Sequence, residues 1–462
     1  MINRRNFLKN SFAGLGVAGG LATNFASFNA FAAGAEDYKA LICVFLSGGM
    51  DSHDTLIPFD QSSYNDYSRI RGRLISGYAG RTRARNNLLE LNGDFDGREF
   101  AFPPEMQGLQ ELYNQGDMAI VGNVGPLIEP VTRTTLRNGT GRTPPRIGSH
   151  NDSTSIWMAS SPEGARTGWG GRFSDIMAAS NANMNSSFAS VSAAGRAIFV
   201  SGENIQPFQV DNNGALGVDH INSNNLLGSS VFADHYNAIL RDAGGLADRD
   251  VSLYGQDLSQ IMNNAIDANN LLDEQLAGPG DPRTAFPNSN LGNQLNIVAR
   301  MISRRQALGA GRQVFFVQLG GFDTHRNQTE TLPEKHQDLS DSMRAFNNAM
   351  KELGVDDNVT AFTASDFGRT LQVSGSGTDH GWGGHHMVMG GAVNGGQIVG
   401  EVPPAALGHE FDLSRGRLIP QVAVDQYAGS LGRWFGLSDS ELIDALPGLN
   451  NFDMNALNGL FG

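Results

Sequence analysis

Uninterrupted apolar runs recur along the chain, and they predict buried strands. Residues 40–46 (ALICVFL) are all apolar, and the run stops at Ser47-Gly48-Gly49. Residues 117–124, 313–319 and 358–363 are also mainly apolar. Strands without a regular polar alternation are typical of parallel sheets, because such sheets are covered on both faces.

Between and around these runs lie segments with the spacing of amphipathic helices, in which apolar residues recur every three or four positions. They are residues 103–115, 231–243, 256–275 and 333–353. Strands that alternate with helices of this length indicate a largely parallel α/β sheet. Residues from about 180 to 290 are rich in Asn and Ser and less regular, and we expect an insertion there.

The first 32 residues predict a twin-arginine export signal. Arg4-Arg5 and Lys9 precede a mildly apolar Gly/Ala-rich run that ends in an A-x-A-like cleavage site at Ala30-Phe31-Ala32. The run lacks the 18 or so strongly apolar residues of a stable membrane span. We therefore expect the twin-arginine machinery to export a folded protein, which would be periplasmic or secreted. Residues 33–462 would then form a single α/β domain.

Charge and cysteine content exclude several classes of partner and site. The 462 residues carry a formal net charge of −14, and removal of the three cations in the signal would leave −17. No cluster of Lys and Arg occurs outside the N-terminus, which argues against nucleic-acid binding because that depends on phosphate neutralisation. The single cysteine, Cys43, excludes an internal disulfide and any CxxC zinc or redox site.

A carboxylate follows three of the predicted strands. Asp51 follows the first strand, Asp323 and His325 follow the run at 313–319, and Asp366 follows the run at 358–363. Ligands of open α/β sheets bind beyond the carboxyl ends of the strands, and Asp and His are donors suited to zinc or manganese. A single aspartate there is more often a helix cap or turn residue, but three, each near glycine, predict a metal site.

A glycine-rich segment at residues 375–386 (GSGTDHGWGGHH) adds three histidines. One of them could simply be satisfied by hydrogen bonds in a turn, but we do not expect all three to be inert, so the segment predicts at least one metal ligand. Successive residues of a strand point to opposite faces, so His385 and His386 cannot easily face one ion together. The pattern does not decide which of these two histidines faces the site.

Ser149 is the candidate nucleophile. It begins the run SHND at residues 149–152, just before a predicted helix, where free N–H groups would favour an anion. The same position suits a serine that only caps the helix, and both roles can hold together. Ser52 is the rival hydroxyl.

These segments together resemble a secreted bacterial family catalogued as domain of unknown function 1501. The resemblance covers nearly the whole chain after the signal and rests, in order, on LSGGMDSHDTLIP, NVGPLIEP, GSHND, GGFDTH, SDFGRT, GTDHGWGGHHMVMGGAVNGGQIVG and GRLIPQVAVDQYAGSLGRWFG. The family is assigned to the alkaline phosphatase-like superfamily of phosphatases, sulfatases and metal-dependent phosphomutases. The resemblance implies a three-layer α/β/α sandwich with a mostly parallel central sheet and a metal-assisted phosphoryl or sulfuryl transfer.

The resemblance also implies residue roles. It matches Asp51, Asp323 with His325, Asp366, and His385 or His386 to metal ligands, with His380 as a replacement for a missing one. The cofactor would be one or two divalent ions, zinc, manganese or calcium, and Ser149 would be the nucleophile by chain order. The chain departs from the superfamily pattern at Phe367 and Asn327, where histidines are expected, and it lacks the C-x-P-S-R or S-x-P-S-R segment that sulfatases need for formylglycine.

We expect an exported metal-dependent hydrolase whose substrate is a small-molecule or polymeric phosphate ester or related anionic ester. The acidic chain would repel such a substrate unless metal ions and Arg369 reverse the field locally. The alternative is a non-catalytic periplasmic or surface scaffold that binds a ligand and keeps the fold. Phe367 and the inexact spacing of Asp323 and His325 favour that alternative.

Overall fold

The computed structural model describes residues 38–462, apart from 79, 81–82, 94, 217–228 and 232–252. The predicted signal therefore lies outside the described residues, as does nearly all of the helix predicted at 231–243. Residues 39–462 form one compact unit. None of the described helices is both long enough and apolar enough to cross a membrane.

A nine-stranded, mostly parallel sheet forms the centre of this unit. Strand β1 (Lys39–Ser47) lies between β8 (Arg312–Gly320) and β9 (Val359–Ser365) and is parallel to both. In this sheet, only β12 (Gly384–Met389) runs antiparallel to its neighbours, β9 and β5 (Met118–Gly125). Shorter strands complete the sheet: β6 (Ser190–Ser192), β7 (Phe208–Gln209), β13 (Ile398–Val399) and β14 (Val422–Ala423). The four strands predicted from apolar runs are thus confirmed.

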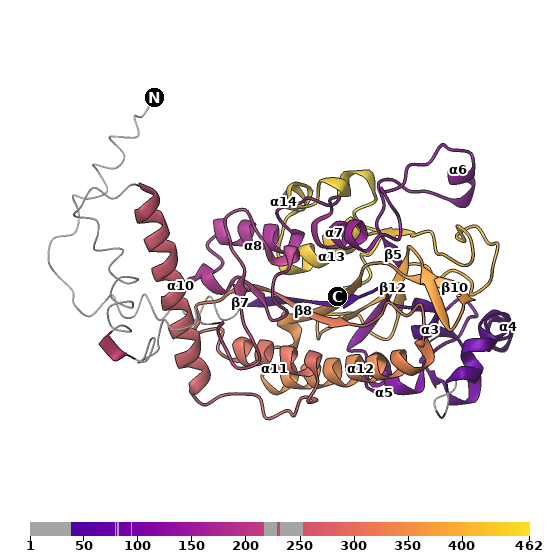
Figure 1. Cartoon of the computed structure of the whole chain (residues 1–462), viewed down its shortest axis with the longest axis horizontal. Coiled ribbons are helices and arrows are strands. Elements are labelled where there is room, and N and C mark those ends of the chain that lie inside the picture. Colours follow the sequence, from indigo (N-terminus) through magenta and orange to yellow (C-terminus); the bar gives the residue numbers. More distant parts are fainter. Residues whose placement is uncertain (1–37, 79, 81–82, 94, 217–228, 232–252) are drawn as a thin grey trace. The chain divides into compact units, whose positions relative to one another are not determined.

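Helices cover both faces of the sheet (Figure 1). One face carries α5 (Gln107–Gln115), α11 (Asn290–Ser303) and α12 (Gln328–Glu352). The opposite face carries α7 (His150–Ala159), α8 (Trp169–Ala179), α13 (Val424–Phe435) and α14 (Asp439–Ala445). This arrangement confirms the predicted α/β/α sandwich.

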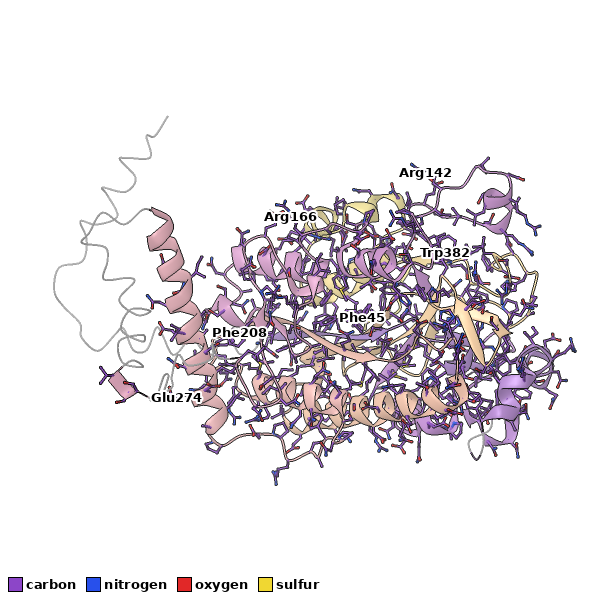
Figure 2. The ribbon with its side chains drawn as sticks, viewed as in Figure 1. Phe45, Arg142, Arg166, Phe208, Glu274 and Trp382 are labelled. Carbon is purple, nitrogen blue, oxygen red and sulfur yellow. The ribbon has the colours of Figure 1, made fainter. Side chains whose placement is uncertain are left out.

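The core of the sandwich is aromatic on the side of α8. Phe45 of β1 packs against Phe316 of β8, with ring centroids 6.1 Å apart. Trp169 of α8 contacts Phe199 edge-on at 4.6 Å, and all four side chains are almost completely buried. Figure 2 shows Phe45 at the central sheet. Such rings bury a large apolar area, which stabilises the sheet against its helices.

Three predicted segments differ from the observed ones. Helix α12 begins at Gln328, five residues before Pro333. Gln328 and Leu332 are buried, and this packing offsets the helical hydrogen bond that Pro333 cannot donate. The segment predicted at 103–115 is a short 3₁₀ helix, Pro104–Met106, followed by α5. Within the expected insertion, β6 and β7 belong to the edge of the central sheet. Strands of two or three residues are too short to show a hydrophobic period.

The remaining elements surround the sandwich. Helix α10 (Leu253–Ala277) contains the predicted segment 256–275. Two small sheets are formed by β10 (Arg369–Ser374) with β11 (Gly377–His380), and by β2 (Ile57–Pro58), β4 (Phe100–Phe102) and β3 (Leu89–Glu90). The other helices are α3 (Ser52–Thr55), α4 (Gln61–Gly77) and α6 (Arg133–Arg137), with 3₁₀ turns at Arg85–Asn87, Ser186–Phe188, Ile198–Val200, Asp356–Asn358 and Pro447–Asn451.

The register of the central strands brings their carboxyl ends to one edge of the sheet. Ser47 of β1 pairs with Gly320 of β8, and Leu46 of β1 pairs with Ser365 of β9. The loops that follow these three strands therefore start side by side.

Candidate metal centre

The loops after β1, β8 and β9 are tied closely together. Gly48 has a φ of 115°, and a Cβ on this residue would lie 2.3 Å from the backbone nitrogen of Asp323. Its N–H donates a hydrogen bond to Oδ1 of Asp366 at 3.0 Å. Only glycine fits here, because the left-handed backbone and the close approach both exclude a side chain.

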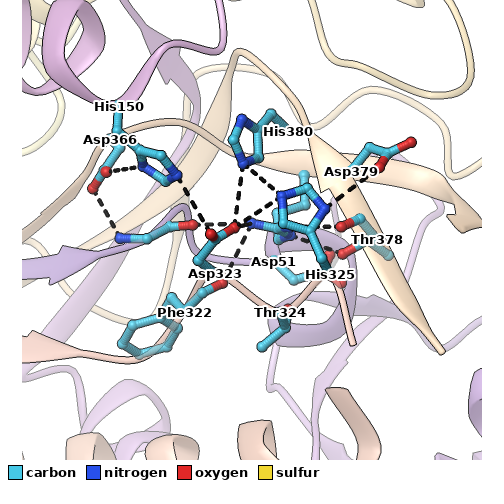
Figure 3. A network of polar contacts seen from close by, with 12 residues as sticks. Asp51, His150, Phe322, Asp323, Thr324, His325, Asp366, Thr378, Asp379 and His380 are labelled. Atoms are coloured by element: carbon cyan, nitrogen blue, oxygen red, sulfur yellow. Dashed lines mark hydrogen bonds and ion pairs between the residues drawn. The ribbon is translucent and has the colours of Figure 1, made fainter. Parts of the chain in front are cut away.

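Three side chains from different parts of the chain meet above these loops. Potential ligand atoms of His150, Asp323 and His380 all lie within 4.8 Å of one another. Nε2 of His380 is 3.2 Å from Oδ1 of Asp323, and Nε2 of His150 is 3.6 Å from Oδ2. Figure 3 shows the two imidazole rings directed at the Asp323 carboxylate. We call His150, Asp323 and His380 the ligand group.

The Nδ1 atoms of both histidines are engaged by acceptors. Nδ1 of His150 donates to Oδ2 of Asp366 at 2.6 Å, and Nδ1 of His380 donates to the backbone oxygen of Gly148 at 2.7 Å. In a neutral imidazole with its proton on Nδ1, Nε2 carries a lone pair. Two lone pairs therefore face a carboxylate, which is unfavourable unless a proton or a cation lies between them. Two imidazole nitrogens and one carboxylate oxygen suit zinc or manganese.

His325 adds a fourth donor beside the ligand group. Its Nε2 lies 3.2 Å from Oδ1 of Asp323 and 2.8 Å from Nε2 of His380. Its Nδ1 lies 3.5 Å from Oδ1 of Asp379, so a proton on Nδ1 is stabilised by that carboxylate. His325 comes from the loop after β8, as the sequence predicted, whereas Asp379 belongs to β11.

The charges around the ligand group keep its members in ligating forms. Burial alone would raise the pKa of the Asp323 carboxyl, but the positive charge and hydrogen bond of Arg369 lower it. Burial lowers the pKa of His380, and the positive charge of Arg369 lowers it further, although the hydrogen bond to the backbone oxygen of Gly148 acts in the opposite direction. An ionised carboxylate and a neutral imidazole are the forms that bind a metal.

Asp366 orients a histidine instead of joining the ligand group. Its two carboxylate oxygens bridge Nδ1 of His150 and the N–H of Gly48, and its side chain is almost completely buried. A carboxylate behind a histidine fixes the imidazole tautomer and orientation at metal sites.

Arg369 was expected to face an anionic substrate, but its guanidinium is buried and surrounded by hydrogen-bond acceptors of the protein. Its guanidinium donates to the backbone oxygens of Gly48 and Thr378, to Oγ1 of Thr378, and to Oδ1 of Asp323 at 3.1 Å. This side chain is completely buried. Arg369 is therefore placed to hold Asp323 in position.

Asp51 does not reach the ligand group because Arg71 of α4 binds it. Two guanidinium nitrogens of Arg71 donate to the Asp51 carboxylate at 2.6 and 2.9 Å, and Gln328 donates to it at 2.7 Å. Burial would raise the pKa of Asp51, but the charge and hydrogen bonds of Arg71 lower it to about 2. With these partners the carboxylate has little capacity left for an ion.

His385 and Ser149 also have partners outside the ligand group. His385 is buried in β12, where its Nδ1 accepts from the N–H of Asn123 at 3.0 Å. Ser149 is the residue before α7, and its hydroxyl donates to Oδ2 of Asp152 at 2.7 Å. His386 contacts Thr363 at 3.3 Å and also lies buried.

The sequence analysis missed His150 as a ligand. The residue follows Ser149 in the run that predicted a helix start, and the first turn of α7 carries its side chain toward Asp323. A histidine at the start of a helix near the strand ends is the one signal that could have identified it. Arg71 lies 20 residues after Asp51, and no sequence pattern links the two.

A cleft of about 340 Å³ opens beside the ligand group. It shares His380 with that group, and it is lined by Ile147, Gly148, His325, Asp379, His380, Gly381, Leu413 and Arg417. The volume is that of a small-molecule site.

Comparison with known proteins gives one family match. The family model described as a protein of unknown function (DUF1501) matches residues 38–446. No curated protein matches the sequence of the chain.

Several solved structures resemble this chain with low TM-scores and low sequence identity. The PsFucS1 sulfatase from Pseudoalteromonas sp. gives a TM-score of 0.33 at 10% identity, over 89% of this chain and 70% of that one. A structure from work on glycosaminoglycan metabolism by Bacteroides thetaiotaomicron gives a TM-score of 0.34 at 11% identity, over 87% of this chain and 74% of that one. These scores are too low to support an argument about activity.

Proposed function

We propose that this chain, which belongs to the DUF1501 family, is a metal-dependent hydrolase of phosphate esters or related anionic esters. His150, Asp323 and His380 would hold one divalent ion, with His325 as a further donor. The observation that carries the proposal is the engagement of both Nδ1 protons, which leaves two Nε2 lone pairs directed at one carboxylate.

The donor set favours zinc or manganese over calcium, because calcium prefers six to eight oxygen ligands. A divalent ion bound here would act as a Lewis acid on the ester and lower the pKa of a bound water. The protein would hold the donors in place: Asp366 orients His150, Gly148 orients His380, and Arg369 orients Asp323.

We propose that water, and not Ser149, is the nucleophile. The Ser149 hydroxyl donates its hydrogen to Asp152, and none of the contacts of the described residues joins it to the ligand group. Hydrolysis forms a bond from the water oxygen to phosphorus or sulfur, breaks the bond to the alcohol oxygen and transfers one proton to the alcohol. His325 also lines the cleft, and if it does not bind the ion it would carry that proton.

Elemental analysis of the purified protein and an ester panel test the proposal together. The panel contains a phosphomonoester, a phosphodiester and a sulfate ester, assayed after chelation and after addition of zinc, manganese or calcium. Asp323→Asn should lose both the ion and turnover. Asp66→Asn, which changes a half-exposed aspartate of α4 paired with Arg69, is the matched control and should keep both.

A stable protein that binds none of these ions would overturn the proposal and support the non-catalytic scaffold. Full turnover of Asp323→Asn would show that the reaction uses another site.

We also propose that the chain is exported by the twin-arginine route, as its first 32 residues predict. Replacement of Arg4 and Arg5 by lysine should retain the protein in the cytosol, as measured by cell fractionation. Export of this double variant at the normal rate would contradict the proposal.

A further inference from the structure

The cleft beside the ligand group contains one arginine, Arg417. Its Nε donates to the backbone oxygen of His380 at 2.9 Å, so the guanidinium is anchored to the segment that carries a member of the ligand group. Leu413 and Ile147 supply apolar side chains to the same cleft. Both side chains pack against a small buried cluster that includes Trp382, and this packing holds the apolar side of the cleft in place.

The guanidinium of Arg417 has donors to spare. Within the described part of the chain, Nε is the only guanidinium nitrogen of Arg417 with a hydrogen bond, and no carboxylate pairs with the group. The neighbouring Arg415 differs, because its Nη1 pairs with Asp379 at 2.7 Å. Arg369 differs as well, since its donors are taken up by Asp323 and by backbone and threonine oxygens. Among the described residues that line the cleft, Arg417 is thus the arginine whose remaining donors are available to a ligand.

We propose that Arg417 is a specificity-determining residue that binds the charged oxygens of the substrate. Arginine suits this role because its planar fork matches the oxygens of phosphate and sulfate groups. The substrate class that fits the cleft is a monoester of phosphate or sulfate with an apolar alcohol, whose organic part lies against Ile147 and Leu413. This inference rests on the proposed function, and it gives to Arg417 the field-reversing role that the sequence suggested for Arg369.

The first test measures binding of inorganic phosphate by calorimetry, in the ion-free and the ion-loaded protein. A hydrogen bond to a charged group contributes about 1.5 to 3 kcal/mol, so Arg417→Gln should weaken phosphate binding by about 10- to 100-fold in both forms. Arg417→Lys keeps the charge and should recover part of the affinity. Arg166→Gln, which changes an exposed arginine of another loop, should have no effect.

The second test compares p-nitrophenyl phosphate with the neutral p-nitrophenyl acetate. Arg417→Gln should raise KM for the phosphate by a similar factor, leave the acetate reaction unchanged and keep the metal content of the wild type. Unchanged phosphate binding in Arg417→Gln overturns the inference, even if the enzyme is a metal-dependent hydrolase. If the wild type binds phosphate through Arg417 but holds no ion, the proposed function fails, and with it the substrate role of Arg417; only an anion-binding site in the cleft remains.

Discussion

The Asp366→Asn substitution tests the tautomer argument directly. Asp366 accepts from Nδ1 of His150 through one oxygen and from the N–H of Gly48 through the other. An asparagine that keeps the Gly48 bond must turn its NH₂ group toward His150. Because an NH₂ group donates, Nδ1 of His150 would become the acceptor and its proton would move to Nε2. A protonated Nε2 cannot bind a metal.

The expected loss of metal affinity in Asp366→Asn is large, although the substitution replaces only one oxygen by an NH₂ group. Mutation of a carboxylate behind a metal-ligating histidine weakens metal binding by about 10- to 100-fold, which is about 1.4 to 2.8 kcal/mol. The 2.6 Å distance between Nδ1 of His150 and Asp366 favours the upper part of this range, since charge-assisted hydrogen bonds are the strong ones. Asp379→Asn is the graded control. The Asp379 carboxylate lies 3.5 Å from Nδ1 of His325 and is partly exposed, so Asp379→Asn should weaken zinc binding by about threefold or less.

Zinc affinity measured by competition with a fluorescent chelator gives the result, and thermal unfolding of the ion-free protein checks that each variant is folded. Long-range ¹H–¹⁵N spectra of the histidine side chains would report the tautomer of His150 independently. Wild-type affinity in Asp366→Asn, with the proton of His150 on Nε2, would refute the reasoning. In that case Nε2 of His150 is not a ligand.

Three further outcomes follow from the contacts of Asp51 and Ser149. Asp51→Asn leaves Arg71 charged and poorly paired, and it should lower the unfolding free energy by about 3 to 5 kcal/mol in urea titrations without changing zinc affinity; lost zinc affinity would place Asp51 at the ion. The pKa of Asp51 is lowered to about 2 in the folded state, so its stabilising effect is complete above about pH 4 and declines as pH falls toward 2. The stability gap between wild type and Asp51→Asn should therefore narrow over that interval, and a constant gap would contradict the assignment. Ser149→Ala removes the hydrogen bond to Asp152 and should lower the unfolding free energy by about 1 to 2 kcal/mol while turnover stays within about threefold. A thousandfold loss of kcat would identify Ser149 as the nucleophile.

Much of the fold follows from local pattern. The runs that form β1, β8 and β9 are apolar throughout, and a strand buried on both faces requires that pattern. Parallel strands end at one edge of the sheet, so the placement of Asp323, His325 and Asp366 near one another was predictable once the strands were recognised. The edge strands β6 and β7 were not, because two or three residues hold no periodic signal.

The identity of the ligand group depended on contacts that local pattern does not encode. His150 reaches Asp323 only because α7 starts beside the strand ends, 173 positions earlier in the chain. Asp51 was assigned to the metal by its position after β1, yet α4 brings Arg71 onto it. His385 lies in β12 between β5 and β9, where both faces are covered, so its imidazole is buried away from the ligand group.

A chain of hydrogen bonds connects the buried Asp51–Arg71 pair to the ligand group. Gln328 donates to Asp51 and accepts from Thr378, whose hydroxyl accepts from Nε of Arg369, and Arg369 in turn donates to Asp323. The two arginines thus neutralise two of the three carboxylates that follow the central strands. One uncompensated negative charge remains, and a single divalent ion would turn it into a net positive charge suited to an anionic ester. A second ion would lack ligands because Asp51 is already bound, and this supports one ion per chain.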